Sequence, residues 1–339
     1  MNISIKLLLS ILSTVLLFSG CAQKIRIKSL VHAEVGEMAD KKKIVISEFR
    51  NDNIGLSAKI ESKIAKHKLD NKRYFTVLNR KNIKNVISEQ RLQSSEMVDE
   101  TTTTKVGRLI GAQAIINGEV ASANAESSRY RLVKEKCLKY VKKEGCVKYK
   151  RYSVICDTTQ ASVSVSLNIV DVETGSIVYG DTISKEYNDD SCISGNILSK
   201  GQAINRLASE IASEFVYKLT PNYVYFDIKL IESIELKNIT TSQKKLFENA
   251  LEYIKAGRLY KADELLYTLM DEVNGKSYVI AYVYGVVKEA RGELNKAKEL
   301  YLIADDLTTE PVDEINKAII RIESSINERV EARRQLNAR

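Results

Sequence analysis

The sequence is poor in histidine, on which many catalytic and metal sites depend, and also in proline and tryptophan. Among its 339 residues it contains no tryptophan, two prolines and two histidines. His32 and His67 have no sequence neighbours that suggest a catalytic triad or a metal site. The acidic pairs Asp189-Asp190 and Asp305-Asp306 do not converge on one proton or ion, because adjacent side chains diverge. With no phosphate-binding glycine-rich loop either, we expect no catalytic residues, no cofactor and no metal, and therefore not an enzyme.

Long apolar runs are missing after the first twenty residues, so no later segment predicts a transmembrane helix. Residues 1–20 themselves match a signal peptide, with Lys6 as the positive start and Leu7–Phe18 as the apolar core. Ser19 and Gly20 then precede Cys21. This segment resembles the lipobox of bacterial lipoproteins, although Phe18 stands where leucine is usual. We expect cleavage before Cys21 and acylation of its sulfur; an ordinary secreted protein is the alternative.

The residue after the cysteine and the net charge both bear on location. By resemblance to lipoproteins of bacteria with two membranes, Ala22 in place of Asp favours an outer-membrane anchor and a body that faces the periplasm. Lys and Arg exceed Asp and Glu by eight. In an exported protein this surplus does not indicate nucleic acid as a partner. Anionic lipid, an acidic partner protein and simple solvation remain open as its explanation.

An even number of cysteines is left after Cys21: Cys137, Cys146, Cys156 and Cys192. In an oxidising compartment this favours two disulfides over free thiols. Zinc is disfavoured, because there is no C-x-x-C pair and no nearby histidine. A hairpin that turns at Thr174-Gly175 pairs residues whose numbers sum to about 348. Cys156 and Cys192 satisfy that sum, which predicts one disulfide between them and leaves Cys137 and Cys146 for the second.

Periodicity predicts an α/β region followed by an all-helical one. Residues 161–172 alternate apolar and polar side chains, as a half-buried antiparallel strand does. The expected strands are 43–49, 74–78, 112–120, 161–172 and 176–186, and the expected helices are 56–67, 80–90, 102–110 and 204–219. This order predicts helices packed on a mixed sheet.

The same patterns divide the chain into segments. After the signal peptide we expect a tether over residues 21–41, an α/β domain over 42–220 with a basic, cysteine-containing hairpin insertion at 121–160, a connector over 221–240 and a helical domain over 241–339. Pro221 marks the boundary before the connector, which reads as extended or as an added strand. A final helix over 312–336 carries an isoleucine stripe, more typical of core than of a free dimer face.

Two stretches of the helical domain resemble tetratricopeptide repeats. They carry small and aromatic residues at matching places: Ala250, Tyr253, Gly257, Ala262 and Leu266 in the first, and Gly285, Gly292, Ala297, Tyr301 and Ala304 in the second. Gly257 and Gly292 lie one residue beyond the ideal period of 34. The pattern favours a groove for a peptide or partner protein, with Tyr253 and Tyr301 as candidate contacts. A helical bundle that only supports the α/β domain is the alternative.

Three motifs in the α/β region carry a family resemblance: Tyr74-Phe-Thr-Val-Leu-Asn-Arg80, Gly111-Ala-Gln-Ala-Ile-Ile-Asn-Gly118 and Ile169-Val-Asp-Val-Glu-Thr-Gly175. Their order and spacing resemble the CsgG family of curli-secretion lipoproteins. The resemblance implies an anticodon-binding-like α/β fold, an envelope role in the secretion or assembly of surface material, and no catalytic residues.

The chain departs from the pore-forming members of that family in its insertions. The first insertion is rich in lysine, and charge at the middle of a bilayer costs roughly 2–4 kcal/mol per residue. The second, 188–200, is short and polar. We therefore expect a scaffold or accessory factor that grips a partner with its basic hairpin, Lys148 and Lys150 included. The alternatives are an oligomeric secretion pore and an activator of a cell-wall synthase similar to LpoB. Expected partners are the membrane, envelope or secretion proteins and further copies of the chain.

Overall fold

The computed structural model describes residues 23–78, 108 and 111–338. The expected helix at 80–90, the expected helix at 102–110 apart from Arg108, the signal peptide and Cys21 lie outside these residues. The chain forms two compact units. One, the α/β unit, contains Ala33–Asn222 and the last residues, Arg334–Arg339. The other, the helical unit, contains the described residues up to His32 together with Tyr223–Arg333. A mixed α/β region followed by an all-helical region confirms the predicted fold class.

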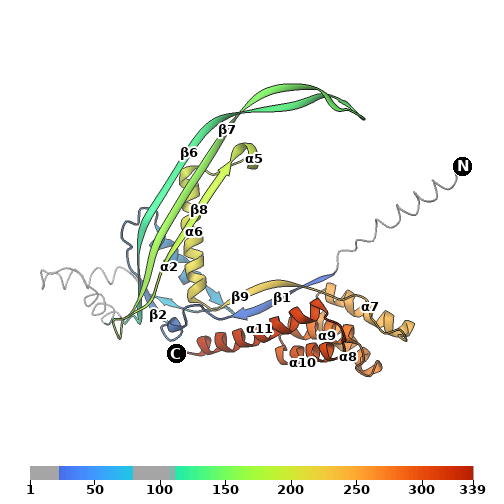
Figure 1. The fold of residues 1–339 in the computed structure, drawn as a ribbon. Coiled ribbons are helices and arrows are strands. Elements are labelled where there is room, and N and C mark those ends of the chain that lie inside the picture. Colours follow the sequence, from blue (N-terminus) through green and yellow to red (C-terminus); the bar gives the residue numbers. More distant parts are fainter. Residues whose placement is uncertain (1–22, 79–107, 109–110, 339) are drawn as a thin grey trace. The chain divides into compact units, whose positions relative to one another are not determined.

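A five-stranded mixed sheet forms the α/β unit, with the order β5-β2-β6-β7-β8 (Figure 1). Its strands are β2 (Lys43–Ile46), β5 (Thr76–Val77), β6 (Ala114–Val141), β7 (Gly145–Asp171) and β8 (Ile177–Asp190). Strand β2 runs parallel to its neighbours β5 and β6, whereas β6, β7 and β8 pair antiparallel. Two short strands, β3 (Lys68–Leu69) and β4 (Lys72–Arg73), make a separate hairpin.

Helices α2 (Leu56–Lys66) and α6 (Lys200–Leu219) cover the sheet. The apolar positions of both helices share one core with the strands: Ile60, Ile64, Leu207, Ile211, Phe215, Val163, Val165, Leu167 and Ile169. Ser199 and Gln202 form a reciprocal capping box at the start of α6, which satisfies backbone groups that the first turn leaves free. A short 3-10 helix, η1 (Gly36–Met38), precedes β2.

Two of the family-like motifs have a direct structural reason. The carboxylate of Asp171 accepts backbone hydrogen bonds from Glu173 (2.7 Å) and Thr174 (3.2 Å), which closes the turn before β8. Gly175 in this turn has φ 76°, a conformation that favours glycine. At Gly118 a Cβ would come within 2.9 Å of the Phe49 ring, so the sheet and that ring meet closely only because no side chain is present.

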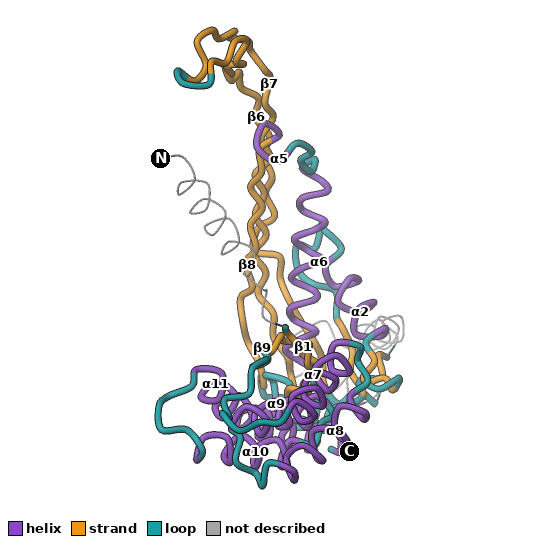
Figure 2. The backbone as a smooth tube through the Cα atoms, turned by 90° about the vertical axis from the view of Figure 1, so that its right-hand side faces the viewer, coloured by secondary structure: helices purple, strands orange, loops and turns teal. Residues whose placement is uncertain are grey.

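The β6–β7 hairpin continues beyond the sheet as a two-stranded arm (Figures 1 and 2). Pairing between β7 and β8 ends at Thr158 and Asp190, and short helix α5 (Ser191–Ser194) follows β8. Strands β6 and β7 remain paired from there to Val141 and Gly145. We call residues 129–155 the arm. The projecting hairpin is therefore shorter than the predicted insertion at 121–160, because residues 158–160 still pair with β8.

Paired helices build the helical unit: α7 (Thr241–Lys255), α8 (Leu259–Glu272), α9 (Tyr278–Ala290), α10 (Leu294–Asp306) and α11 (Asp313–Asn337). The last residues of α11, from Arg334, belong to the α/β unit. Gly257 and Gly292, which end α7 and α9, both adopt positive φ. A Cβ on Gly285 would come within 2.6 Å of the Tyr301 ring, so a small residue there lets α9 and α10 pack closely. Among the described residues, no helix is long and apolar enough to span a membrane.

The expected tether over residues 21–41 is wrong. Residues Lys24–Val31 form β1, which pairs with β9 (Asn222–Lys229) in a two-stranded ribbon. Ile25 and Ile27 are buried in the core of the helical unit. The alternating sequence Lys-Ile-Arg-Ile-Lys forms this strand. Its three charged residues are typical of a polar tether, which is why the segment was not predicted as a strand. The added strand that was one expectation for the segment after Pro221 is β9.

Candidate binding surfaces

Two disulfides fix the arm. Cys156 on β7 bonds Cys192 on α5, with 5.3 Å between their Cα atoms. Cys137 on β6 bonds Cys146 on β7 near the tip, with 5.8 Å between their Cα atoms. This is the pairing that the hairpin register predicts, because the β7–β8 partners do sum to 348, as in Thr158 and Asp190. One bond therefore ties the base of the arm to α5, and the other closes its end.

The arm carries a charge equal to the net charge of the whole chain. Residues 129–155 contain ten Lys or Arg and two Glu, a net of +8, and the formal net charge of the chain is also +8. Lys136 lies directly opposite Lys150, and Lys139 opposite Lys148. Like charges in directly opposite positions destabilise a β-ladder. Among the described residues none of these four lysines has an ion pair, so their charge is available to a partner.

Apolar and aromatic side chains are interspersed with the cations. They are exposed to solvent: Tyr130, Leu132, Val133, Leu138, Tyr140, Val147, Tyr149, Tyr152 and Ile155. Isolated exposed apolar residues are common, but several on one projecting element favour an interaction site. The arm therefore combines a cationic field with apolar contact area.

Polar contacts at the base of the arm hold α5 in place. The Tyr130 hydroxyl donates to Asp190 Oδ2 (2.6 Å), and Lys134 Nζ donates to the Cys192 carbonyl (3.4 Å). Asp190 also caps α5 by accepting from the Cys192 N–H (2.7 Å). Asp190 and the sulfurs of Cys156 and Cys192 are one group within the described residues with the spacing of metal ligands. Because both sulfurs are in a disulfide, this group acts as a structural staple.

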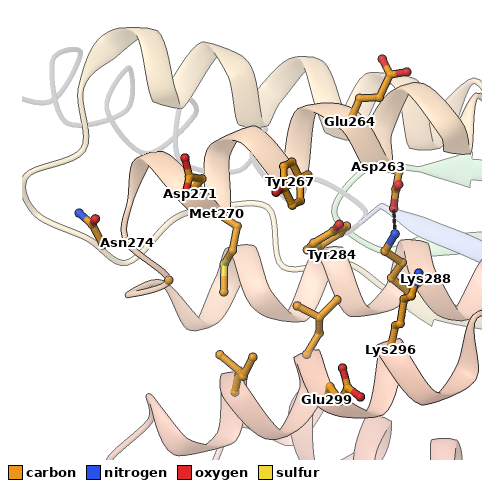
Figure 3. Close-up of a pocket in the computed structure, with 13 residues that line it drawn as sticks. Asp263, Glu264, Tyr267, Met270, Asp271, Asn274, Tyr284, Lys288, Lys296 and Glu299 are labelled. Carbon is orange, nitrogen blue, oxygen red and sulfur yellow. Dashed lines mark ion pairs between the residues drawn. The ribbon is translucent and has the colours of Figure 1, made fainter.

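A groove of about 790 Å³ lies on the helical unit between α8, α9 and α10 (Figure 3). Its lining is apolar and aromatic where the helices face each other: Tyr267, Met270, Tyr284, Leu300 and Ile303. Tyr267 is 67% exposed, so its ring is available to a ligand. Four carboxylates and two ammonium groups also line the groove: Asp263, Glu264, Asp271, Glu299, Lys288 and Lys296. The groove is therefore apolar with a net acidic lining.

One wall of the groove is fixed by an ion pair. Lys288 Nζ lies 2.6 Å from Asp263 Oδ1, and Arg291 also pairs with Asp263. Burial alone would lower the pKa of Lys288, but the hydrogen bond and charge of Asp263 outweigh it and raise that pKa. Lys288 therefore stays charged and remains in the ion pair with Asp263. Asp271 and Glu299 have no ion pair among the described residues, which leaves them available to a cationic ligand.

The structure places the predicted contact residues in different surroundings. Lys148 and Lys150 are exposed on β7 of the arm. Tyr253 is half-buried against the helical core, and the Arg258 guanidinium lies 4.9 Å from its ring centroid. Tyr301 is fully buried, so its predicted role in partner binding is wrong. Its size and spacing mark a helix-packing residue, and its hydroxyl donates to Glu289 (2.6 Å).

The two histidines take part in local contacts. His32 Nδ1 lies 2.6 Å from Glu328 Oε2. Burial lowers the pKa of His67, a change that its hydrogen bond with Pro221 partly opposes. The groove residues Tyr267, Tyr284 and Glu299 are not among the contacts predicted from the sequence. The repeat spacing that identified α8 and α9 could have found them, since it fixes which helix faces meet.

Comparison with protein-family models matches residues 42–212 to the family described as "Curli production assembly/transport component CsgG". No curated protein matches the sequence.

Similar solved structures share little sequence with this chain. Lipoprotein GNA1162 from Neisseria meningitidis is 14% identical, covering 51% of this chain and 96% of that chain with a TM-score of 0.27. The LpoB C-terminal domain from Salmonella enterica is 13% identical, covering 44% and 91% with a TM-score of 0.25. The PelC dodecamer from Paraburkholderia phytofirmans is 9% identical, covering 57% and 98% with a TM-score of 0.25. The assignment therefore depends on the family model: with residues 42–212 matched, half of its length, the chain belongs to the CsgG family.

Proposed function

We propose that this protein is an outer-membrane lipoprotein, anchored through Cys21 and facing the periplasm, that acts as a scaffold or accessory factor in the secretion or assembly of surface material. Membership in the CsgG family supports the envelope role. The signal peptide and Cys21 in the sequence support the anchor. Two disulfides support an oxidising compartment, because cytosolic thiols are kept reduced.

The arm is the observation that carries the scaffold role. Its lysine pairs destabilise the hairpin, and the Cys137–Cys146 bond closes the strands that carry them. The arm retains these lysines although their repulsion lowers its stability, and exposed tyrosines lie next to them. This combination fits contact with an acidic surface of an envelope or secretion protein. Charge complementarity of this kind sets association rate and partner choice more than affinity.

The groove supports a second contact, with an apolar peptide segment that carries a basic residue. Tyr267, Met270 and Ile303 offer the apolar surface, and Asp271 and Glu299 offer the charge. Paired helices that present such a groove, with glycines 35 residues apart, fit a tetratricopeptide-like module. The protein would then join two partners, one through each unit.

An oligomeric secretion pore is the second candidate, and the length of β6 and β7 favours it. A lipid-facing hairpin needs one face that is apolar over about nine to eleven residues of each strand. Here one face of the arm carries the Lys136 and Lys150 pair, and the other carries Glu135 paired with Arg151. Charge on both faces supports the scaffold over the pore.

Photo-crosslinking in intact cells tests the scaffold role. A photoreactive phenylalanine analogue would replace Tyr149, which lies between Lys148 and Lys150, and crosslinked proteins would be identified by mass spectrometry. We expect one dominant partner, lost when Lys148→Glu and Lys150→Glu are combined. The control, Lys244→Glu with Lys245→Glu on α7, makes the same charge change elsewhere and should retain the crosslink.

The outcomes separate the two candidates. Crosslinks only between copies of the chain, together with conducting rings after detergent extraction, would establish the pore in place of the scaffold. Replacement of Cys21 by serine should release the protein from the membrane fraction, and unchanged sedimentation would refute the anchor. A second photoreactive residue at Tyr267 tests the groove, with Glu299→Lys expected to weaken its crosslink.

A further inference from the structure

The β1–β9 ribbon has a basic outer face. Ile25 and Ile27 are buried in the helical unit, and Lys24, Arg26 and Lys28 alternate with them on the exposed side. Among the residues that the structure describes, no carboxylate pairs with any of these three cations. The ribbon therefore presents a row of available positive charge.

Tyrosines from β9 lie among these cations. The Arg26 guanidinium is 5.4 Å from the centroid of the Tyr225 ring, and Lys28 Nζ is 3.5 Å from that of Tyr223. Tyr225 is 55% exposed. Asp227 and Lys229 follow on the same side of β9, and Lys229 pairs with Glu314. Tyrosine and basic residues are the side chains enriched where proteins meet the headgroup region of a membrane.

Hydrogen bonds fix the start of the ribbon to the helical unit. The Gln23 N–H donates to Glu232 Oε1 (2.6 Å), and Gln23 Nε2 donates to the Leu251 carbonyl (3.0 Å). The Gln23 carbonyl accepts from the Leu230 N–H (2.8 Å). Only Ala22 separates this fixed residue from Cys21. Two peptide steps reach at most about 7 Å, so an acyl chain on Cys21 would hold the ribbon at the bilayer surface.

We propose that the outer face of the β1–β9 ribbon binds anionic phospholipid headgroups. This rests on the lipid anchor proposed above and specifies how the anchored protein meets its membrane. The anchor supplies proximity within one Debye length, about 8 Å at physiological salt. Lys24, Arg26 and Lys28 then supply charge attraction, and Tyr225 lies at the headgroup level. The helical unit thereby rests against the membrane through one defined face.

A tryptophan reporter can test this contact without background, because the chain has no tryptophan. Protein that starts at Cys21 would be coupled through that thiol to maleimide lipid in vesicles of phosphatidylglycerol and phosphatidylethanolamine with brominated acyl chains. The other four cysteines are in disulfides, so coupling is specific. We expect bromine to quench the reporter in Tyr225→Trp and in Asp227→Trp. The control Tyr267→Trp, exposed on α8, should be quenched less.

Charge removal separates headgroup binding from mere proximity. Combined Lys24→Gln, Arg26→Gln and Lys28→Gln should reduce the quenching, since each cation shifts the contact equilibrium about fivefold. The matched control, Lys244→Gln, Lys245→Gln and Lys276→Gln, should leave it unchanged. Zwitterionic vesicles or high salt should have the same effect as the ribbon variant.

The possible results distinguish this proposal from the anchor itself. Chemical coupling makes the vesicle test independent of acylation in the cell. Absence of an acyl group by mass spectrometry of protein from membranes would refute the anchor. Correctly coupled, disulfide-bonded protein in which both ribbon reporters are quenched no more than Tyr267→Trp would refute headgroup binding. Quenching that the ribbon variant does not reduce would also overturn it.

Discussion

The arm exposes lysines that have no acidic partner, whereas the helical unit contains a buried and paired glutamate. In the arm, Lys136 and Lys150 face each other across two strands with no acid between them, and disulfides hold the strands. In the helical unit, Glu289 is 2% exposed and accepts two hydrogen bonds from Arg321 (both 2.9 Å). One region exposes unbalanced charge at a cost in stability, and the other buries balanced charge. The difference indicates that the arm is built for contact and the helices for rigidity.

Removal of the buried acid should have the largest effect. Glu289→Ala would leave the Arg321 guanidinium without its partner and would remove the acceptor of the Tyr301 hydroxyl. Breaking a buried pair in this way costs about 3–5 kcal/mol. Chemical denaturation of the helical unit, followed by circular dichroism, measures the loss. In the control Glu289→Gln the side-chain oxygen remains as an acceptor, so it should lose less. A loss below about 1 kcal/mol in Glu289→Ala would contradict the comparison.

Removal of the base disulfide should have the next largest effect, and it should be local. Cys156 and Cys192 are separated by 36 positions, and a cross-link over a loop of that size stabilises by roughly 3–4 kcal/mol. Combined Cys156→Ser and Cys192→Ser should increase amide hydrogen exchange in the arm and α5. The matched removal of Cys137 and Cys146 closes a shorter loop and should cost less, roughly 2–3 kcal/mol. Equal exchange in both variants would show that the arm does not depend on α5.

Sequence patterns predicted structural features correctly where one local pattern determines the feature. The hairpin register needs only the alternation of residues 161–172 and the turn at Thr174-Gly175, so it located the Cys156–Cys192 pair. Likewise, Gly175 predicted the turn before the returning strand, because positive φ favours glycine at that position. In both cases the residues involved are close in sequence or in direct register.

Features that depend on distant partners could not be predicted in this way. Strand β1 exists because β9, about two hundred residues later, pairs with it and because the helical core covers Ile25 and Ile27. No pattern within 21–41 names that partner. Tyr301 matched a repeat position, but only the packed helices show that it is buried and that its hydroxyl donates to Glu289. The groove itself arises where three helices meet.

The α/β unit contains a charge that is neither unpaired, as in the arm, nor part of a buried ion pair. The carboxylate of Asp52 stabilises the start of helix α2. Asp52 accepts backbone hydrogen bonds from Leu56 (2.7 Å) and Ser57 (2.9 Å) at the start of α2. Burial raises the pKa of Asp52, but these hydrogen bonds outweigh burial and hold it below its ordinary 3.8. The folded state therefore binds this proton less readily than the unfolded state. The stabilisation is present above pH 3.8 and is lost as pH falls through the lower, folded pKa.

Asp52→Ala should cost about 1 kcal/mol at neutral pH, as loss of a helix cap does. The difference from the original protein should shrink as pH falls below 3.8, because the carboxylate is then protonated in both states. Thermal unfolding at a series of pH values measures it, and Asp52→Asn, which keeps one acceptor oxygen, should lie between. A difference that does not change with pH would mean that the lost contact is not ionic.

The smallest effect should be a gain in stability, in the arm itself. Lys136→Glu would place a carboxylate opposite Lys150 and replace repulsion by attraction across the two strands. Cross-strand pairs of opposite charge contribute about 0.2–1 kcal/mol, so exchange of the arm amides should slow slightly. Lys142→Glu, in the turn after β6, makes the same charge change without an opposite lysine and serves as the control. If the arm is built for contact, Lys136→Glu should stabilise the hairpin and at the same time weaken the crosslink from Tyr149. A variant that is more stable and equally well crosslinked would show that the lysine pairs do not serve partner binding.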